Sequence, residues 1–307
     1  MTVPLDSEYV LEVAGLTRRY GAKAALDDIW LKVPRGAVFG LVGENGAGKT
    51  TLIKHLMGLL KPQFGSVRVF GRDPVIDPEG ALSRIGYLSE DRSMPLWMSV
   101  TELMGYTRAF YPKWDQTFAD ELRETFALDP KAKVRHLSRG ERAKLGLLLA
   151  LAHRPELLIL DEPSSGLDLA VRRHILTAII QTVAEEGRTV LFSSHLLDEV
   201  DRVADYVTMI NQGQIVLSST MDEAKEAHHR ITLRFAESQR RMPSLPGALF
   251  CEGSGQEWSV VCNGRLEELK KAAESAGAEI LAEQIPSLED IFLAHASNAP
   301  RAAKEED

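Results

Sequence analysis

Two kinds of hydrophobic pattern divide the first part of the chain. Residues 9–13 and 25–33 alternate apolar and polar side chains, which is typical of strands with one buried face. Residues 38–42 and 157–160 are apolar throughout, as expected of central parallel strands that are buried on both faces. From residue 94 onward, apolar side chains recur every three or four positions, which predicts helices. The pattern therefore predicts an α/β core with an antiparallel β subdomain and a helical insert at about residues 94–144.

The pattern changes again near residues 218–220. Before this point we expect a helix at 169–186, a strand at 189–192 and a hairpin around Gly213, which continue the α/β alternation. Beyond it the expected elements are strands at 231–235, 248–251, 258–261 and 279–284 and helices at 266–276 and 288–295. The chain is thus predicted to comprise a first domain at residues 1–218, a small α+β accessory domain at 219–297 and a disordered tail at 298–307.

A glycine-rich segment follows the apolar strand at residues 38–42. Its sequence, Gly43-Glu44-Asn45-Gly46-Ala47-Gly48-Lys49-Thr50, fits the pattern G-x-x-x-x-G-K-[ST]. The glycines let successive backbone N–H groups face inward, and the N-terminus of a helix beginning near Lys49 adds a positive dipole end. This combination predicts a polyphosphate site in which Lys49 reaches the β- and γ-phosphates and Thr50 ligates Mg²⁺. The alternative is a glycine-rich turn with a structural role alone.

Two carboxylates end the apolar strand at residues 157–160. Asp161 directly follows the strand, and Glu162 comes next. Asp161 is expected to hold Mg²⁺, as the strand-end aspartate does in P-loop ATPases. Glu162 points in another direction and can act as general base on the attacking water. The alternative is an acidic strand end that faces solvent.

A second candidate anion site lies upstream of these carboxylates, in Leu137-Ser138-Arg139-Gly140-Glu141. Ser138 and Gly140 offer a hydroxyl and a close backbone approach at the start of a predicted helix. The same spacing also fits an ordinary capping box between Ser138 and Glu141. One chain would thus carry two half-sites for phosphate.

The order and spacing of these motifs resemble the nucleotide-binding subunit of the ATP-binding cassette (ABC) transporter family. The resemblance runs from about Tyr9 to Leu217 and includes Ser165-Gly166-Leu167-Asp168 and Ser194-His195. It implies an ABC-type ATPase with a P-loop NTPase core at residues 1–218, which binds ATP and Mg²⁺. It also implies a head-to-tail homodimer or heterodimer, with ATP between the phosphate loop of one copy and the signature loop of the other. The ending Pro286-Ser287-Leu288-Glu289-Asp290-Ile291-Phe292 resembles ATPase subunits of type-2 (ABC-2) exporters, which work with a separate multi-spanning permease.

The resemblance implies roles for individual residues. Tyr20 is similar to the aromatic side chain that stacks on adenine and His195 to the histidine that contacts the γ-phosphate; the alternatives are a core aromatic and an ordinary loop histidine. The implied catalytic residues are Glu162, His195 and Lys49. The implied ATP contacts are Tyr20, Gly43, Glu44, Asn45, Gly46, Ala47, Gly48, Lys49, Thr50 and Thr51 in one copy and Ser138, Arg139, Gly140, Glu141 and Asp168 in the other. Asp168 would couple the two sites, and the implied Mg²⁺ ligands are Thr50, Asp161 and Glu90.

Two segments depart from the usual family pattern. Glu90, in Gly86-Tyr87-Leu88-Ser89-Glu90, stands where the family usually has Gln. A carboxylate can accept from Mg²⁺-bound water but cannot donate, which makes Glu90 the weaker of the predicted metal ligands. Arg139 and Glu141 replace the first Gly and the Gln of the signature Leu-Ser-Gly-Gly-Gln. Arg139 either neutralises triphosphate charge or points to solvent.

The helical insert faces the membrane partner in this family. Four aromatic side chains, Trp97, Phe110, Tyr111 and Trp114, fall within it. They either contact a coupling helix of the permease or pack inside the insert.

The composition limits which classes of partner and which cellular compartment we expect for this protein. With 36 Lys+Arg against 44 Asp+Glu, the net charge of −8 argues against a nucleic-acid partner. No apolar run approaches the roughly 20 residues of a membrane span, and Asp6 and Glu8 do not fit a secretory signal. Cys251 and Cys262 lack metal-ligand spacing, which suits a reducing compartment. We therefore expect a cytoplasmic protein that is attached to the cell membrane through its permease.

Two other functions stay open at this point. The first is a soluble ABC-type ATPase coupled to a non-transport target, although such proteins usually carry two cassettes or a long coiled-coil insert. The second is a module that binds ATP as a regulatory ligand, against which the intact Glu162 and His195 argue.

Overall fold

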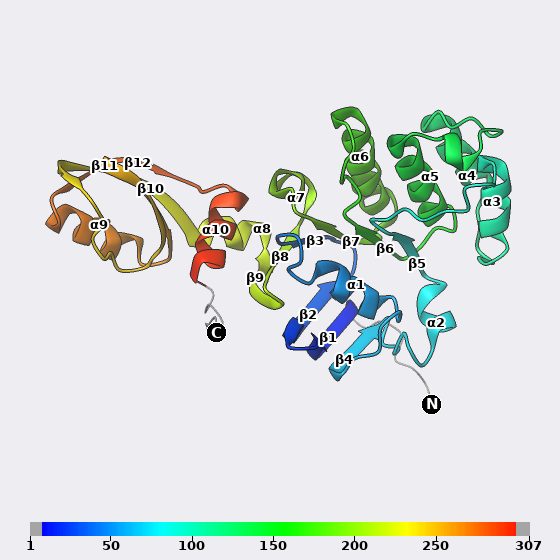
Figure 1. Cartoon of the computed structure of the whole chain (residues 1–307), viewed down its shortest axis with the longest axis horizontal. Helices are drawn as coiled ribbons and strands as arrows, with labels where there is room; N and C mark the ends of the chain where they lie inside the picture. The colour runs from blue at the N-terminus through cyan, green and yellow to red at the C-terminus, as the bar shows by residue number, and fades with distance from the viewer. Residues whose placement is uncertain (1–7, 299–307) are drawn as a thin grey trace.

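A six-stranded sheet forms the centre of the molecule (Figure 1). The computed structural model describes residues 8–298, without the side chains of residues 179, 181–186, 297 and 298. The strands follow in the order β5 (Ile85–Leu88), β6 (Leu157–Asp161), β7 (Thr189–Ser194), β3 (Val38–Val42), β8 (Tyr206–Asn211) and β9 (Gln214–Thr220). All neighbouring pairs are parallel except β8 and β9, which form the predicted hairpin at Gly213. The two continuous apolar runs are the fully buried strands β3 and β6, as predicted.

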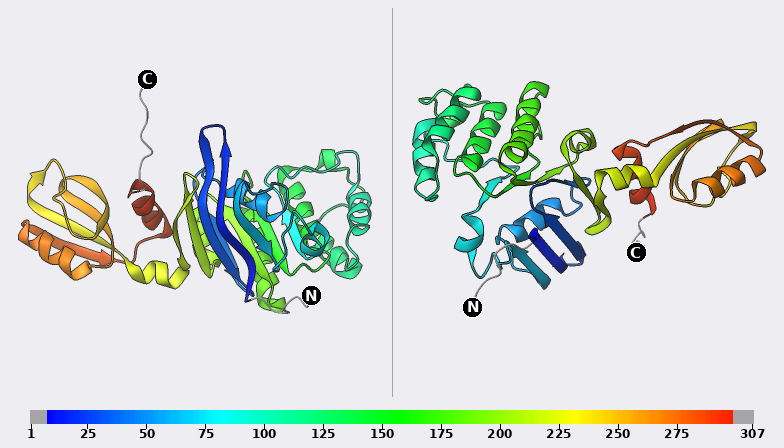
Figure 2. Two further views of the ribbon diagram at one scale, coloured as in Figure 1. Left: turned by 90° about the horizontal axis from the view of Figure 1, so that it is seen from below. Right: turned by 180° about the vertical axis from the view of Figure 1, so that it is seen from behind.

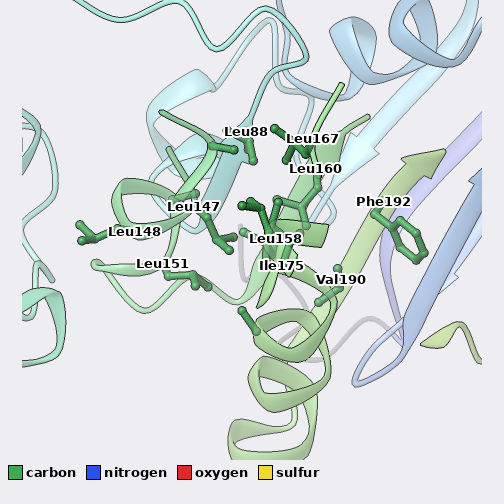
Figure 3. Close-up of a cluster of buried hydrophobic side chains, with 14 of the residues drawn as sticks. Leu88, Leu147, Leu148, Leu151, Leu158, Leu160, Leu167, Ile175, Val190 and Phe192 are labelled. Carbon is green, nitrogen blue, oxygen red and sulfur yellow. The ribbon is translucent and has the colours of Figure 1, made fainter. Parts of the chain in front are cut away.

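Each face of this sheet is covered by a different layer. Because successive strand side chains point to opposite faces, Phe39 and Ile159 belong to one buried cluster and Val38 and Leu158 to another. On the second face, helix α5 (Arg139–Leu151) contacts β5, and its Leu147 and Leu151 belong to the same buried cluster as Leu158 and Val190 (Figure 3). The sheet is therefore hydrophobic on both sides, as a doubly covered parallel sheet requires.

The first face packs on the antiparallel subdomain. Its three strands are β2 (Lys23–Pro34), β1 (Tyr9–Tyr20) and β4 (Phe64–Val69), in that order. The alternating segments at residues 9–13 and 25–33 are parts of β1 and β2, which form a long hairpin (Figure 2). Helix α1 (Lys49–Leu56) buries Leu52, Ile53 and Leu56 in the cluster that this subdomain shares with the central sheet. A short helix, α2 (Pro78–Leu82), precedes β5.

Helices cover the second face. The insert contains α3 (Val100–Arg108), α4 (Gln116–Thr125), a 3₁₀ turn at Val134–His136 and the first part of α5 (Arg139–Leu151); α6 (Leu169–Glu186) and α7 (Leu197–Val203) follow. Helix α3 starts later than the apolar pattern suggested, because Ser99 and Glu102 form a capping box that fixes its N-terminus. Trp114 packs against the core, and Tyr111 stacks on His153 with ring centroids 3.8 Å apart. Trp97 and Phe110 are exposed.

A separate three-stranded sheet lies towards the C-terminus. It has the order β11 (Ala248–Asn263), β10 (His228–Gln239), β12 (Ala278–Gln284), and helix α9 (Leu266–Ser275) packs on it. The predicted strands at 248–251 and 258–261 both fall within the range of β11. The chain turns back between them at Gly253 and Gly255, which adopt positive φ, and a Cβ on Gly253 would lie 2.4 Å from the carbonyl oxygen of Glu257. Arg230 accordingly donates to both Glu252 and Ser259.

The last helix returns to the first domain. Helix α10 (Leu288–Asn298) lies between the C-terminal sheet and the central sheet in Figure 1 and contacts α7 and β9. Leu288, Ile291 and Phe292 join the buried cluster on the second face of the central sheet, as do Met221 and Ala224 of α8 (Met221–Ala227). Both helices were assigned by sequence to the small domain, yet their apolar faces complete the core of the first. Residues 299–307 of the predicted tail lie outside the described residues.

Candidate functional site

The glycine-rich loop lies between β3 and α1, as its sequence predicts. Gly43 packs so closely on β8 that a Cβ there would lie 2.3 Å from the carbonyl oxygen of Ile210. Gly48 has φ 119°, and a Cβ on it would lie 2.6 Å from the carbonyl oxygen of Ala25. Side chains at these positions would displace the loop, so both glycines are needed for its path.

Lys49 is buried beneath this loop. Its Nζ donates to the carbonyl oxygens of Gly43 at 2.6 Å and Glu44 at 3.2 Å. It also lies 3.0 Å from Glu162 Oε1, and both side chains are 5% exposed. The ammonium group thus makes two hydrogen bonds and one ion pair with oxygens of the same chain. Any phosphate that Lys49 binds must take the place of at least one of them.

Asp161 ends β6 next to β7 and is almost fully buried. Strand register places it opposite Ser193, whose Oγ donates to Asp161 Oδ1 at 2.7 Å. Thr50 Oγ1 donates to the same oxygen at 3.3 Å, while Asp161 Oδ2 has no hydrogen-bond partner among the described atoms. Burial raises the pKa of Asp161, and the neighbouring Glu162 adds to this effect.

These features fit a magnesium ion. Mg²⁺ prefers oxygen ligands and takes one or two from the protein, with the rest from phosphates and water. Thr50 and Asp161 offer such oxygens side by side, and a cation would satisfy the unpaired Asp161 Oδ2. No cluster of three or more His, Cys, Asp or Glu side chains that could hold a metal by themselves occurs among the residues that the structure describes. A magnesium ion here would therefore depend on the nucleotide for further ligands.

Glu162 turns away from Asp161 towards the glycine-rich loop. Its backbone adopts φ 48°, and its N–H donates to Ser193 Oγ at 3.0 Å. The Oε2 atom lies 2.7 Å from His195 Nδ1, so Nδ1 carries the hydrogen that the carboxylate accepts. A neutral His195 ring then has its lone pair on Nε2. Glu162 thus lies between Lys49 and His195 and is held by both.

A cavity of about 400 Å³ opens above these groups. It is lined by Tyr20, Lys23, Ala25, Asn45, Gly46, Gly48, Lys49, Thr50, Thr51, Glu90 and Glu162. Tyr20 is 50% exposed at the turn between β1 and β2, with the Arg18 guanidinium 4.8 Å from its ring centre, which excludes the alternative of a core aromatic. Glu90 lines the rim, but no hydrogen bond joins it to Thr50 or Asp161 in the described part of the chain.

The second predicted half-site lies elsewhere. Ser138 caps α5: its Oγ accepts from Glu141 N at 3.2 Å, and Glu141 Oε2 accepts from Ser138 N at 2.8 Å. The hydrogen bond from the Ser138 backbone N–H, followed by the Ser138 side chain, lowers the pKa of Glu141. Gly140 lets α5 approach α6, because a Cβ there would lie 2.9 Å from Val171 Cγ2. None of these residues lines the cavity of Lys49.

Arg139 and Asp168 also stay apart from that cavity. Arg139 is exposed and lines a different cavity, of about 290 Å³, with Arg92 and Gly166. Asp168 Oδ1 accepts from Val171 N at 3.0 Å and so caps α6. The residues of the second predicted half-site therefore do not line the cavity of Lys49, although Glu90 lines both that cavity and the one with Arg139.

Ser193 is a site residue that the motifs did not reveal. One hydroxyl bridges the two carboxylate segments, since it accepts from Glu162 N and donates to Asp161 Oδ1. The only sequence signal is a pair of polar residues, Ser193 and Ser194, at the end of an apolar strand. The register of β6 with β7 places Ser193 opposite Asp161 and so shows that this polar residue belongs to the site.

Comparisons with known proteins agree with this arrangement. The family model described as "ABC transporter" matches residues 26–165. The chain is 33% identical to daunorubicin resistance ATP-binding protein DrrA3 of Streptomyces coeruleorubidus, over 97% of this chain and 99% of that protein. It is 30% identical to Nod factor export ATP-binding protein I of Rhizobium johnstonii, over 94% of each. A solved structure of an ATP-binding subunit of an ABC transporter matches with a TM-score of 0.65 and 28% identity, covering 71% of this chain and 92% of that one.

Proposed function

This chain belongs to the ATP-binding subunits of the ABC transporter family, and we propose that it acts as a head-to-tail dimer that drives export through a separate membrane permease. The fold is that of an ABC-type ATPase, as the sequence predicted. The dimer is a homodimer or pairs this chain with a similar subunit. The substrate passes through the permease and not through this chain.

One observation carries the proposal of a dimer. Lys49, Thr50, Asp161 and Glu162 gather at one cavity, while Ser138 lies outside it. The Ser138 hydroxyl accepts from Glu141 N, and a phosphate oxygen of a neighbouring molecule could accept its hydrogen in turn. Two copies in head-to-tail contact would bring each Ser138 to the other's cavity and form two complete sites.

The contacts of Glu162 support its role as general base. In the proposed reaction, the β- and γ-phosphates take N–H donors of Lys49, which releases Glu162 Oε1 from its ion pair. The carboxylate then accepts a proton from the attacking water. His195 keeps the carboxylate in place through Nδ1 and offers Nε2 to the γ-phosphate. Mg²⁺, held by Thr50 and Asp161, would neutralise charge on the β- and γ-phosphate oxygens.

The surface of the helical insert supports a permease contact. A groove of about 560 Å³ lies between α2 and α3, lined by Pro78, Glu79, Leu82, Ser83, Thr107, Phe110 and Tyr111. Phe110 is 63% exposed at this groove. No helix that the structure describes is long and apolar enough to cross a bilayer, so a membrane-spanning partner would supply the path. Attachment through this groove would place the protein on the cytoplasmic face of the membrane.

Export as the direction of transport rests on the relatives. Daunorubicin resistance and Nod factor export are the roles that their names give to those two proteins. Both match nearly the whole of this chain, over 97% and 94% of its length. We propose the same direction here.

Replacement of the general base tests the proposal. Glu162→Gln should still bind Mg-ATP, because Lys49 and the loop N–H groups remain, but should lower ATP hydrolysis by at least about 10²-fold. The ATP-bound dimer should then accumulate, as measured by light scattering after size exclusion. Parent-like phosphate release, or a monomer at saturating ATP, would contradict the assignment.

The same variant tests the permease. A multi-spanning membrane protein should co-purify with the ATP-bound Glu162→Gln dimer in detergent. Glu121→Gln is the matched control, since Glu121 lies on α4 away from the cavity and should change neither hydrolysis nor assembly. A dimer that forms with ATP but binds no such membrane protein would support the proposed ATPase mechanism and contradict the proposed role in transport.

A further inference from the structure

Helix α7 carries a buried carboxylate that none of the proposed steps uses. Glu199 is 7% exposed and lies in the first turn of α7. Burying a carboxylate costs several kcal/mol unless hydrogen bonds and charges compensate. The contacts of Glu199 therefore indicate why a carboxylate is buried at this position.

The first contact reaches the segment that follows Glu162. Ser164, also buried, donates its hydroxyl hydrogen to Glu199 Oε2 in a short hydrogen bond. Ser164 is two residues from Glu162 and is separated from it by Pro163. Because proline restricts the backbone, fixing Ser164 also limits where Glu162 can lie.

The second contact reaches the segment that carries His195. Ser194 Oγ lies 3.4 Å from the same Glu199 Oε2, and it accepts from Leu196 N at 3.0 Å. Ser194 directly precedes His195, and Leu196 directly follows it. The Ser194 hydroxyl therefore connects the residues on both sides of His195 to Glu199. One carboxylate oxygen therefore contacts both segments whose side chains meet in the Glu162–His195 hydrogen bond.

The third contact reaches the segment that leads to Asp168. Glu199 Oε1 has no hydrogen-bond partner among the described atoms and lies 4.0 Å from Arg172 Nη1. Arg172 in turn donates through Nε to the carbonyl oxygen of Leu167 at 3.0 Å. Glu199 thus has a favourable charge contact with the residue that holds the turn before α6.

We infer that Glu199 is a positioning residue, which sets the place of Glu162 against His195 by holding Ser164 and Ser194 together. It touches neither nucleotide nor metal ligand, since its contacts are Ser164, Ser194 and Arg172. The inference rests on the proposed catalytic role of Glu162. A displacement of about 1 Å in a catalytic group can cost on the order of 10²-fold in rate, so loss of Glu199 should lower turnover and leave nucleotide binding intact.

Steady-state phosphate release and Mg-ATP affinity test this inference. Glu199→Ala should lower kcat at least about tenfold, with the KM and the dissociation constant for ATP within about twofold of the parent values. Glu199→Gln keeps an oxygen that accepts from Ser164, and it should recover most of the lost turnover. A merely structural role would lower the melting temperature but not produce this split between kcat and KM.

Ser164→Ala supplies a second measurement. If Ser164 and Glu199 act through one contact, the Ser164→Ala/Glu199→Ala double variant should lose no more turnover than the worse single variant. This comparison stays available if Glu199→Ala fails to fold, because Ser164→Ala and Glu199→Gln can then be compared in the same way. Losses that multiply would overturn the shared role.

Asp198→Ala is the matched control. Asp198 is the exposed carboxylate next to Glu199 on α7 and should give parent-like kcat. An equal loss in Asp198→Ala, or parent-like kcat in Glu199→Ala, would overturn the inference. Absence of turnover in the parent protein would instead contradict the proposed ATPase mechanism itself.

Discussion

At the scale of single residues, Lys49 and Glu162 depend on each other. The ammonium group forms an ion pair with the carboxylate, and the carboxylate avoids the cost of a buried unpaired charge. In the proposed mechanism, a triphosphate that binds Lys49 takes the place of Glu162. Under the proposed mechanism, binding of the substrate to Lys49 therefore also releases the catalytic base, Glu162.

Another buried residue makes stability depend on pH. His153 donates through Nε2 to the carbonyl oxygen of Ile85 at 3.0 Å, and burial lowers its pKa to about 4. The unfolded chain takes up this proton below a pH of about 6.5, whereas the folded chain does not. The free energy of unfolding should therefore fall by about 3 kcal/mol as the pH drops from 6.5 towards 4.

Urea unfolding between pH 7.5 and 4 measures this effect. His153→Phe keeps an aromatic ring against Tyr111 but cannot titrate, so its stability should fall less steeply over the same range. At pH 7.5 the variant should be less stable by about 1 kcal/mol, because the bond to Ile85 is lost. Parallel curves for parent and variant would show that His153 takes up its proton equally in both states.

Most of the site residues could be predicted from sequence, but the contacts between their side chains could not. The glycines, Lys49, Thr50 and Asp161 follow from a motif with fixed spacing after a strand. The direction of Glu162 does not, because it depends on a positive φ that its neighbours stabilise through Ser193. Glu199 could not be found either, since its partners lie 35 and five residues away in the sequence.

At the scale of elements, strand order explains why the site forms. Strands β3, β6 and β7 are neighbours and parallel, so their carboxyl ends meet at one edge of the sheet. Apolar runs predicted β3 and β6 as central strands, while their adjacency to β7 became visible only in the fold. Helix α10 shows what the sequence could not predict. Its sequence predicted a helix, but not that this helix would be buried in the core of the first domain.

Helix α10 should matter for the stability of the first domain. Phe292 is 5% exposed and borders a cavity with Gly43, Asn45 and His195. Phe292→Ala should lower the free energy of unfolding by about 3 kcal/mol or more, as expected for a buried phenylalanine. Phe64→Ala, which alters a side chain that is 67% exposed, should change it by less than about 0.5 kcal/mol. Urea unfolding that showed equal losses in both variants would contradict the docking of α10.

The same packing changes how the C-terminal part can be studied. A chain ending at Ser218 would lack Met221, Ala224, Leu288, Ile291 and Phe292, all of which lie in the core of the first domain. Truncation there would therefore expose apolar surface as well as remove the small sheet. Single substitutions in α10 separate these two effects.

At the scale of the whole molecule, one chain is an incomplete enzyme in this account. The cavity with Lys49 and Glu162 is lined by neither Ser138 nor Asp168. The small C-terminal sheet has its own buried cluster, which contains no residue of either half-site. We therefore expect it to contribute contacts to the dimer or the permease and no catalytic group.

Mixing two damaged subunits measures the central claim most directly. Lys49→Ala and Ser138→Arg homodimers should each hydrolyse ATP poorly, because every composite site in them has one defect. A mixed dimer has one site with both defects and one with neither. An equal mixture should thus recover up to about a quarter of parent phosphate release, since half of randomly formed dimers are mixed and each holds one intact site of two. No recovery, in mixtures whose dimers are shown to exchange subunits, would contradict a site built from two chains.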